Sequence, residues 1–335
     1  MRVDAIGLDI GGANLKAATS AGRALSRPFA LWKHPDRLAD ELAAVAAELR
    51  PTGPVAVTMT GELCDCFETK RDGVQHILAA VARTIPADRS GVWSTRGRFL
   101  SLEEAAKRPL EVAAANWHAL ATYAGRFAPE GFALLIDTGS TTTDVIPLRD
   151  GCPVPMGRTD TDRLHSGELV YTGVRRTPVC SLLGPLVMAE FFATVHDAYI
   201  RLGMLPEEPE NCETADGRPM TARHAHARLA RMIGGDPEVI SEATTLALAR
   251  DVRQRQVEVL QAGLARVCAR NGDRPRAVIV SGSGEFLARA AVEASWAGEA
   301  RGPAVIALTE RLGPNRSAAA CAYAVAVLAA EEANG

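Results

Sequence analysis

Apolar and polar residues follow one another along this chain in a pattern that predicts strands and helices in turn. Short apolar runs typical of buried strands occupy residues 3–9, 54–60, 132–137 and 277–280. Between them, apolar residues recur at helical spacing; the predicted helices are 35–49, 73–84, 111–124, 184–202, 221–233, 237–271 and 317–332. Strand and helix signals that alternate in this way indicate an α/β protein.

Two stretches of the chain have nearly the same pattern. Residues 7–16 read GLDIGGANLK, and residues 135–145 read LIDTGSTTTDV. Each is an apolar run, an Asp, a turn of small or hydroxyl residues and a second run, which predicts a β-hairpin with an acid at its tip. Backbone N–H groups in such a turn can approach an anion closely, and the Asp beside it can hold a hydrated Mg²⁺. Two such tips that face each other would grip a chain of phosphates.

This repeat predicts a duplicated fold with a cleft between two domains. We expect a first α/β domain at residues 1–128, with the C-terminal helix 315–335 packing back on it. A second α/β domain is expected at 129–314, with a helical insertion at about 184–272. A third glycine-rich turn follows the strand at 277–280, and three such turns after buried strands make a chance repeat improbable.

The composition is that of an ordinary globular protein, with 335 residues, 47% of them hydrophobic and 23% charged. A net charge of −3 gives no reason to expect a nucleic acid or a membrane as partner. The first residues do not form a signal-peptide pattern, and no apolar run reaches the length of about 18 residues that a membrane span needs. We therefore expect a cytoplasmic protein whose seven cysteines are free thiols.

The three turns supply the strongest candidate site residues, although a plain structural turn would explain each one alone. An anion site fits better, because backbone N–H groups, hydroxyls and a lysine all suit phosphate oxygens. The candidates are Asp9, Gly11, Gly12, Asn14 and Lys16 in the first turn, Asp137, Thr138, Gly139, Ser140, Thr141, Thr142 and Asp144 in the second, and Ser281, Gly282, Ser283 and Gly284 in the third.

Further polar residues are candidates for substrate contact. They are Thr60 and Glu62 after a buried strand, and Arg158, Asp160, Asp162, Glu168, Tyr171, Arg175 and Arg176 in a charged segment without helical periodicity. The alternatives are a strand-end turn and a solvated loop. Two adjacent arginines can hold a carboxylate or a phosphate bidentately. The polar stretch 211–219 is expected to be an exposed turn. The chain contains no G-x-S-x-G, H-E-x-x-H or Walker A motif, which weakens hydrolase, zincin and P-loop interpretations.

In this order the three turns resemble the phosphate-binding loops of the sugar kinase/Hsp70/actin (ASKHA) superfamily. Residues 9–14 match its first phosphate loop, 137–143 its second, and 281–284 its nucleotide-side glycine turn. The chain is more closely similar to the hydantoinase A/oxoprolinase branch, and within it to tetrahydromethanopterin-linked one-carbon pathway proteins. The segments that carry this similarity are GLDIGGANLKAA, AAANWHALATYAG, DTGSTTTDVIPL, GELVYTGVRRTPVC and ETADGRP. The resemblance implies two ribonuclease H-like domains with an interdomain cleft.

The resemblance also implies a function in methanofuran or methylofuran biosynthesis. The expected enzyme is a transferase that joins an (aminomethyl)furanylmethyl diphosphate to the phenol oxygen of γ-glutamyltyramine or a tyrosine analogue, forming an aryl ether and releasing diphosphate. Mg²⁺ held by Asp9 and Asp137, directly or through water, would neutralise the diphosphate. The acid that takes the phenol proton stays open among Asp144, Asp160, Asp162 and Glu168.

Two other functions stay open. One is an ATP-dependent kinase or a hydantoinase/oxoprolinase-like amidohydrolase of the same fold, although ATP is not the favoured ligand. The other is a non-enzymatic nucleotide sensor whose output is cleft closure. The expected partners are small molecules, and the sequence leaves the oligomeric state open.

Overall fold

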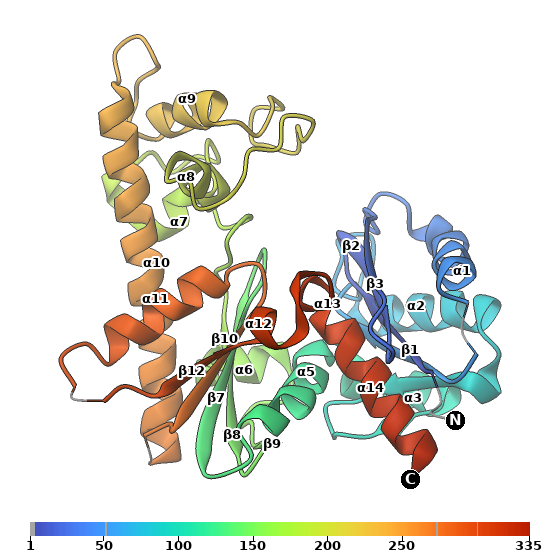
Figure 1. Ribbon diagram of the computed structural model, residues 1–335. Coiled ribbons are helices and arrows are strands. Elements are labelled where there is room, and N and C mark those ends of the chain that lie inside the picture. Colours follow the sequence, from blue (N-terminus) through green and yellow to red (C-terminus); the bar gives the residue numbers. More distant parts are fainter. Residues whose placement is uncertain (1–3, 51, 273, 300) are drawn as a thin grey trace.

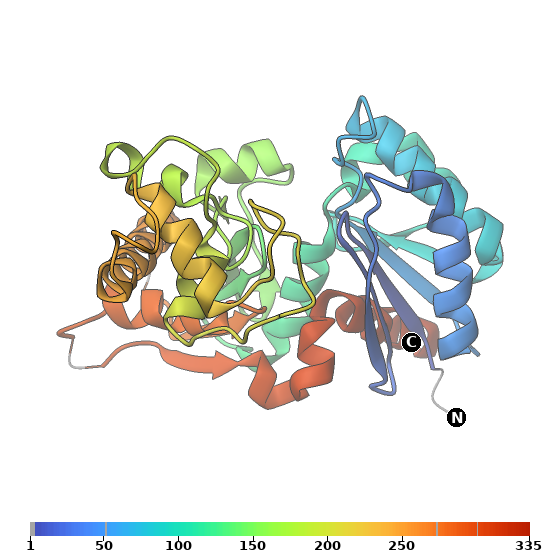
Figure 2. The ribbon, with the colours of Figure 1, turned by 90° about the horizontal axis from the view of Figure 1, so that it is seen from above.

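The chain forms two lobes in a computed structural model that describes residues 4–50, 52–272, 274–299 and 301–335 (Figures 1 and 2). Each lobe is built on a mixed six-stranded sheet. Val3, where the first predicted strand begins, lies outside the described residues. None of the helices in the described part of the chain combines the length and the apolar character that a membrane span requires.

The first sheet has the strand order β3-β2-β1-β4-β5-β6. Its central strand, β1, pairs antiparallel with β2 and parallel with β4, so that the predicted hairpin stands at the middle of the sheet. The strands are β1 (Ile6–Ile10), β2 (Asn14–Thr19), β3 (Ala24–Pro28), β4 (Val55–Met59), β5 (Ser90–Trp93) and β6 (Phe99–Leu100). Every residue of β1 and β4 is buried, as expected for strands covered on both faces.

Helices cover both faces of this sheet. Apolar residues of α1 and α2, such as Leu42 and Ile77, share one core with Leu8 and Val57 of the sheet. Capping boxes begin α2 at Thr69 and α3 at Ser101. The helices of this lobe are α1 (Leu38–Leu49), α2 (Lys70–Thr84), α3 (Leu102–Lys107), α4 (Pro109–Val112) and α5 (Asn116–Ala124), with 3₁₀ turns η1 (Pro35–Arg37), η2 (Ala87–Arg89) and η3 (Gly125–Phe127).

The junction of the two lobes is formed by α5 and the C-terminal helix α14 (Ala320–Asn334), which lie between the two sheets (Figure 1). Trp117 and Tyr323 of these helices pack with Ile146 and Ile279 of the second sheet. On the first lobe, α14 approaches β1 so closely that a Cβ at Gly7 would lie 1.9 Å from the carbonyl oxygen of Ala322. Glycine is therefore required there for α14 to pack on the first lobe.

The second sheet has the order β10-β8-β7-β11-β12, with β9 paired to β8. Its β7–β8 hairpin is antiparallel, and β11 runs parallel to β7, which repeats the arrangement of β2, β1 and β4. The strands are β7 (Phe132–Thr138), β8 (Thr143–Arg149), β9 (Cys152–Pro153), β10 (Leu169–Val170), β11 (Ala277–Ser281) and β12 (Ala304–Ala307). The predicted fold class is thereby confirmed, with two similar α/β halves.

A group of helices extends from this sheet on the side away from the junction (Figure 1). The longest, α10, has 30 residues and packs through Val257 and Leu264 with residues of β7 and β11. The helices of this lobe are α6 (Asp160–Ser166), α7 (Val179–Leu183), α8 (Val195–Arg201), α9 (Ala222–Met232), α10 (Glu242–Asn271), α11 (Glu285–Ser295), α12 (Leu308–Leu312) and α13 (Pro314–Ala318), with the 3₁₀ turn η4 (Gly184–Leu186).

Two of the predicted helices are wrong as continuous elements. The helix predicted at 184–202 is broken, because Gly184 has φ 54° and is followed by a proline, so regular helix returns only at Val195. The helix predicted at 111–124 is two short helices separated at Ala114, whose φ is 46°. The long helix predicted to begin at 237 begins at Glu242, where the Ser241 hydroxyl caps it.

Candidate active site

The first turn, residues 9–14, closes the β1–β2 hairpin tightly. The Gly11 N–H donates to the carbonyl oxygen of Asn14 at 3.1 Å. The end of β4 packs directly on this turn, because a Cβ at Gly61 would lie 3.2 Å from the backbone of Gly11. The N–H groups of Thr60 and Gly61 both donate to the carbonyl oxygen of Ile10. The segment that carries Thr60 and Glu62 therefore forms one side of the first turn.

The second turn, residues 137–143, repeats this geometry. The Gly139 N–H donates to the Thr142 carbonyl oxygen at 2.8 Å. The third turn, residues 281–284, packs on it: the Gly284 N–H donates to the Thr138 carbonyl oxygen at 2.8 Å, and a Cβ at Gly282 would lie 2.2 Å from that oxygen. The third turn then feeds the N-terminus of α11.

Strand register gives the two hairpin acids equivalent places. Asp9 lies opposite Lys16 on β2 and Thr58 on β4. Asp137 lies opposite Asp144 on β8 and Ser281 on β11. Side chains directly opposite one another in neighbouring strands share a face of the sheet, so each acid is flanked by two polar groups. The candidates Asp9 and Lys16 are thus brought together on one sheet, and Asp137, Asp144 and Ser281 on the other.

The two acids also share one electrostatic environment. Burial raises the pKa of Asp9 to about 6, while the Lys16 ammonium acts to lower it. Burial, and after it the Asp144 carboxylate, raises the pKa of Asp137 to about 6; Ser281 and Lys16 act to lower it, and Asp9 to raise it. Lys16 and Asp9 on the first sheet therefore lie close enough to Asp137 on the second sheet to influence its charge. Asp9 Oδ1 is buried and has no hydrogen-bond partner among the described residues.

A cysteine that is not among the sequence-based candidates lies close to Asp9 and Asp137. Cys321, at the start of α14, is buried, and its pKa is raised well above the usual value by burial and by the charges of Asp9, Asp137 and Asp144. Its thiol therefore stays protonated and packs as a small apolar group. No sequence signal marks it, because only the folded chain brings α14 to both hairpins.

The other acidic candidates have partners. Asp144 accepts from Arg163 at 2.6 Å, and the guanidinium of that arginine lies 3.9 Å from the centre of the Trp117 ring. Asp160 forms an ion pair with Lys70 at 2.6 Å, which joins α6 of the second lobe to α2 of the first. Sequence analysis missed Lys70, Arg163 and Trp117 as partners, since these contacts join distant parts of the chain.

Two further acids hold backbone in place. Glu168 is buried, and its carboxylate accepts from the backbone N–H of Met156 at 2.7 Å and of Gly157 at 3.0 Å. Asp162 caps α6 through the Thr159 hydroxyl and N–H. These contacts give both carboxylates structural roles in ordering the segment before α6.

The arginine-rich segment packs over the second turn. The N–H groups of Arg175 and Arg176 both donate to the Ser140 carbonyl oxygen, and a Cβ at Gly173 would lie 2.5 Å from the backbone of Ser140 and Thr141. The Arg176 guanidinium lies 5.5 Å from the centre of the Trp32 ring of the first lobe. It thus reaches across from the second lobe to the first.

The remaining substrate-contact candidates are more dispersed. Arg158 donates to the Thr95 carbonyl oxygen at 3.0 Å, which is another contact between the lobes. Arg175 is paired with Glu208 at 2.6 Å. Tyr171 is 66% exposed. The turn hydroxyls differ as well: Thr138 is buried and accepts from Thr143, whereas Ser140 and Thr141 contact each other at the partly exposed tip.

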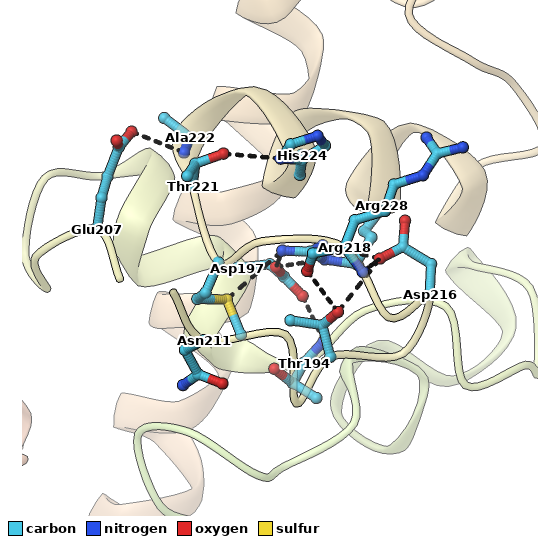
Figure 3. Close-up of polar contacts among 12 residues, drawn as sticks. Thr194, Asp197, Glu207, Asn211, Asp216, Arg218, Thr221, Ala222, His224 and Arg228 are labelled. Atoms are coloured by element: carbon cyan, nitrogen blue, oxygen red, sulfur yellow. Dashed lines mark hydrogen bonds and ion pairs between the residues drawn. The ribbon is translucent and has the colours of Figure 1, made fainter. Parts of the chain in front are cut away.

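The polar turn 211–219 is held in place by a buried arginine (Figure 3). Arg228 of α9 is fully buried; it pairs with Asp197 of α8 at 2.7 Å and with Asp216 of the turn at 2.9 Å. The Arg218 carbonyl oxygen accepts from the same guanidinium. This network fixes the turn to α8 and α9. Asn211 of the turn donates a hydrogen bond to Glu208, which is the partner of Arg175.

Two acid-tipped hairpins on two similar sheets define a protein of the ASKHA fold. The chain belongs to the hydantoinase/oxoprolinase family, whose model matches residues 54–331.

Individual proteins show in more detail what this chain is similar to. It is 31% identical over 339 residues to the (4-{4-[2-(gamma-L-glutamylamino)ethyl]phenoxymethyl}furan-2-yl)methanamine synthase of Methanocaldococcus jannaschii, and the alignment covers 98% of each chain. A synthase of the same name from Methanococcus vannielii is 29% identical over 210 residues, covering 60% of this chain and 92% of its own. The nucleotide-free structure of acetone carboxylase, 11% identical, superposes with a TM-score of 0.54 over 97% of this chain and 70% of its own, which shows a shared fold.

Proposed function

We propose that this protein catalyses the condensing step of methanofuran-type cofactor biosynthesis. In this step an (aminomethyl)furanylmethyl diphosphate and the phenol oxygen of γ-glutamyltyramine, or of a tyrosine analogue, form an aryl ether with release of diphosphate. The observation that carries the proposal is the pair of acid-tipped hairpins, which suits a diphosphate, in a chain 31% identical to a synthase that is named for the product of this step.

The residues present fit a magnesium ion. Asp9 Oδ1 is a buried carboxylate oxygen without a partner among the described residues, and Asp9 influences the pKa of Asp137. No cluster of three or more His, Cys, Asp or Glu side chains suited to a metal is found within the described ranges. Mg²⁺ is commonly held by one or two carboxylates together with substrate phosphates and water. Asp9 and Asp137 would hold it, and when bound it would neutralise charge on the departing diphosphate.

The chain's own groups would stabilise the leaving group further. The furan ring oxygen stabilises positive charge on the methylene carbon, so the carbon–diphosphate bond breaks readily once charge on the diphosphate is balanced. The first and second turns offer backbone N–H and hydroxyl donors, and Lys16 adds a cation that already influences both acids. Preorganised donors aimed at developing negative charge lower the barrier because they need no reorganisation during the reaction.

An ATP-dependent kinase or amidohydrolase of the same fold is the second candidate function. The specific observation in its favour is the third turn, which packs on the second turn and leads into the N-terminus of α11 as a nucleotide-side turn would. A non-enzymatic nucleotide sensor is a third possibility, and it predicts that Asp9→Ala and Asp137→Ala change only partner binding.

The test is reconstitution with purified protein, Mg²⁺, the furanylmethyl diphosphate and either γ-glutamyltyramine or tyrosine, followed by mass spectrometry. The proposal expects the ether and one diphosphate per turnover without ATP. Product that forms only when ATP is consumed would establish the second candidate instead, and calorimetry with Mg·ATP gives an independent measure of nucleotide binding. Asp9→Asn and Asp137→Asn should each abolish ether formation.

A further inference from the structure

Glu62 is a buried acid beside the first turn. It follows Gly61, which packs on the backbone of Gly11, and the backbone of Glu62 itself is pressed against α2 at Gly73. The side chain is 1% exposed, and Oε2 has no hydrogen-bond partner within the described part of the chain. A carboxyl group left unsatisfied in the interior is energetically unfavourable, so its retention calls for an explanation in function.

Glu62 shares this property with Asp9, which is already assigned to the metal, and differs in it from Asp144, Asp160 and Glu168. Asp144 and Asp160 are held by Arg163 and Lys70, and Glu168 holds the backbone N–H groups of Met156 and Gly157. A carboxylate that already accepts strong hydrogen bonds is a poor proton acceptor for a substrate. Among these candidates for the base, Glu62 is the one with a buried carboxyl oxygen, Oε2, that has no partner within the described residues.

The surroundings of Glu62 adjust its acidity. Burial raises the pKa of Glu62 to about 7, and the backbone N–H groups of Glu62 and Ala114 act to lower it. Two charged neighbours act in opposite directions: Lys70 of α2 lowers the pKa and Asp160 of α6 raises it. Cys64 in the next loop is another titratable neighbour, and burial raises its pKa to about 11, so it stays neutral. An acid that titrates near neutral pH is well matched to general-base catalysis.

Glu62 also lies where the lobes meet. The Lys70–Asp160 ion pair joins the lobes at 2.6 Å, and both of its charges act on Glu62. Each member of the pair is about one quarter exposed, so solvent reaches this contact. An acceptor molecule that binds between the lobes at this ion pair would therefore lie close to Glu62.

We propose that Glu62 is the general base of the condensation. This inference rests on the function proposed above. The phenol O–H proton passes to the Glu62 carboxylate, and the phenol oxygen uses the freed electron pair to form a bond to the furanylmethyl carbon. The bond from that carbon to the diphosphate oxygen breaks, and its electron pair leaves with the diphosphate. The proton on Glu62 then returns to water.

The experiment compares the rate of ether formation between about pH 5.5 and about 8.5 in the wild type and four variants. Proton transfer by a positioned side chain typically accelerates a reaction about a hundredfold or more. Glu62→Gln should lower kcat by about that factor and lose the decline of rate as the pH falls through about 7, with little change in KM for the diphosphate substrate. Asp160→Asn should move the decline to lower pH, and Lys70→Met to higher pH. Glu111→Gln is the matched control, because Oε2 of Glu111 is also buried without a partner in the described ranges yet lies outside the proposed site.

Each result has a defined meaning. Absence of ether in the wild type overturns the proposed function and this inference with it. If the wild type forms the ether and Glu62→Gln keeps the same rate and pH profile, the inference alone is overturned. The inference is also overturned if Glu62→Gln changes only the KM for the phenolic acceptor.

Thermal unfolding confirms that Glu62→Gln is folded. Because it removes a buried charge, the variant should melt above the wild type at pH 8, and the difference should shrink toward pH 5 as Glu62 becomes protonated. Glu62→Asp, which keeps a carboxylate, should recover part of the activity.

Discussion

Asp137 and Asp144 face each other in register across the β7–β8 hairpin, and the buried guanidinium of Arg163 pairs with the second of them at 2.6 Å. Two carboxylates on one face of a hairpin repel each other unless a cation balances them. Arg163, stacked on Trp117 of the junction helix α5, supplies that cation to Asp144. The charge of the Asp144 carboxylate is thereby balanced within the fold.

Loss of this ion pair should destabilise the protein. Asp144→Asn leaves the Arg163 charge buried at 1% exposure without its carboxylate, and removal of one partner from a buried pair typically costs about 3–5 kcal/mol. Urea denaturation followed by circular dichroism gives the free energy of unfolding. Glu331→Gln, which breaks the exposed pair with Arg126 at 3.0 Å, is the control and should change it by less than about 1 kcal/mol. Equal losses in the two variants would contradict the structural role of Asp144.

Glycine at position 282 should be needed for the site and not only for the turn. Gly282 has φ 89°, and a Cβ there would lie 2.2 Å from the Thr138 carbonyl oxygen and 2.8 Å from Asp137 Oδ1. Gly298 has a similar φ of 84° with no atom within 4 Å, so Gly298→Ala carries only the backbone strain of about 1–3 kcal/mol.

We expect Gly282→Ala to displace the second turn as well and to abolish binding of inorganic diphosphate with Mg²⁺ in calorimetry. Gly298→Ala should bind as the wild type does. Normal binding by Gly282→Ala would mean that the third turn does not position the second.

Local sequence patterns predict most of the strands and helices of this fold, but few of the contacts between residues that are far apart in the chain. The hairpins at 7–16 and 135–145 are visible because an Asp followed by small residues interrupts apolar runs. The pairing of Lys70 with Asp160 joins residues 90 positions apart and leaves no trace in periodicity. The packing of the C-terminal helix on the first lobe is predicted from the sequence, but the contact of α14 with the second sheet, through Tyr323, is not.

The helix errors have a local physical reason. Apolar spacing continues from 184 to 202, but Gly184 adopts a backbone conformation that favours glycine, and the proline after it lacks an N–H. Similarly, the Ala-rich run at 111–124 has high helix propensity throughout, yet Ala114 is held at φ 46° between α4 and α5. At Gly184 the local Gly-Pro pair ends the helix, whereas at Ala114 the fold overrides the local preference. The strained residue Ala114 lies beside Glu62, and backbone strain of this kind is often found at functional sites.

Removal of the Lys16 charge should weaken diphosphate binding. The Lys16 ammonium lowers the pKa of both Asp9 and Asp137, so it lies close to both acids. A hydrogen bond to a charged group contributes about 1.5–3 kcal/mol. Lys16→Met should therefore raise the Kd for Mg²⁺-diphosphate about tenfold or more. Calorimetry at two salt concentrations checks this, since a charge contribution declines with ionic strength. Lys107→Met, at a site 70% exposed in a helix-surface pair, is the control. An unchanged Kd in Lys16→Met would remove Lys16 from the site.

Acid should destabilise the protein through His118. Burial, followed by the charges of Arg158 and Arg163, lowers the pKa of His118 to about 4. In the unfolded chain a histidine titrates near about 6.5. As the pH falls from that value toward about 4, the unfolded chain binds a proton that the folded chain does not, so the free energy of unfolding decreases. Below the folded-state pKa both states are protonated and the loss is complete.

His118→Gln isolates this effect from that of Asp9, Asp137 and Glu62, whose raised pKa values act in the opposite sense. The stability of the wild type relative to His118→Gln should fall by up to about 3 kcal/mol between pH 7 and pH 4, measured by urea denaturation at each pH. Trp93→Phe, which alters the ring 6.0 Å from His118, serves as a packing control and should lose the same amount at every pH. A difference between wild type and His118→Gln that stays constant with pH would show that this histidine takes up its proton equally in both states.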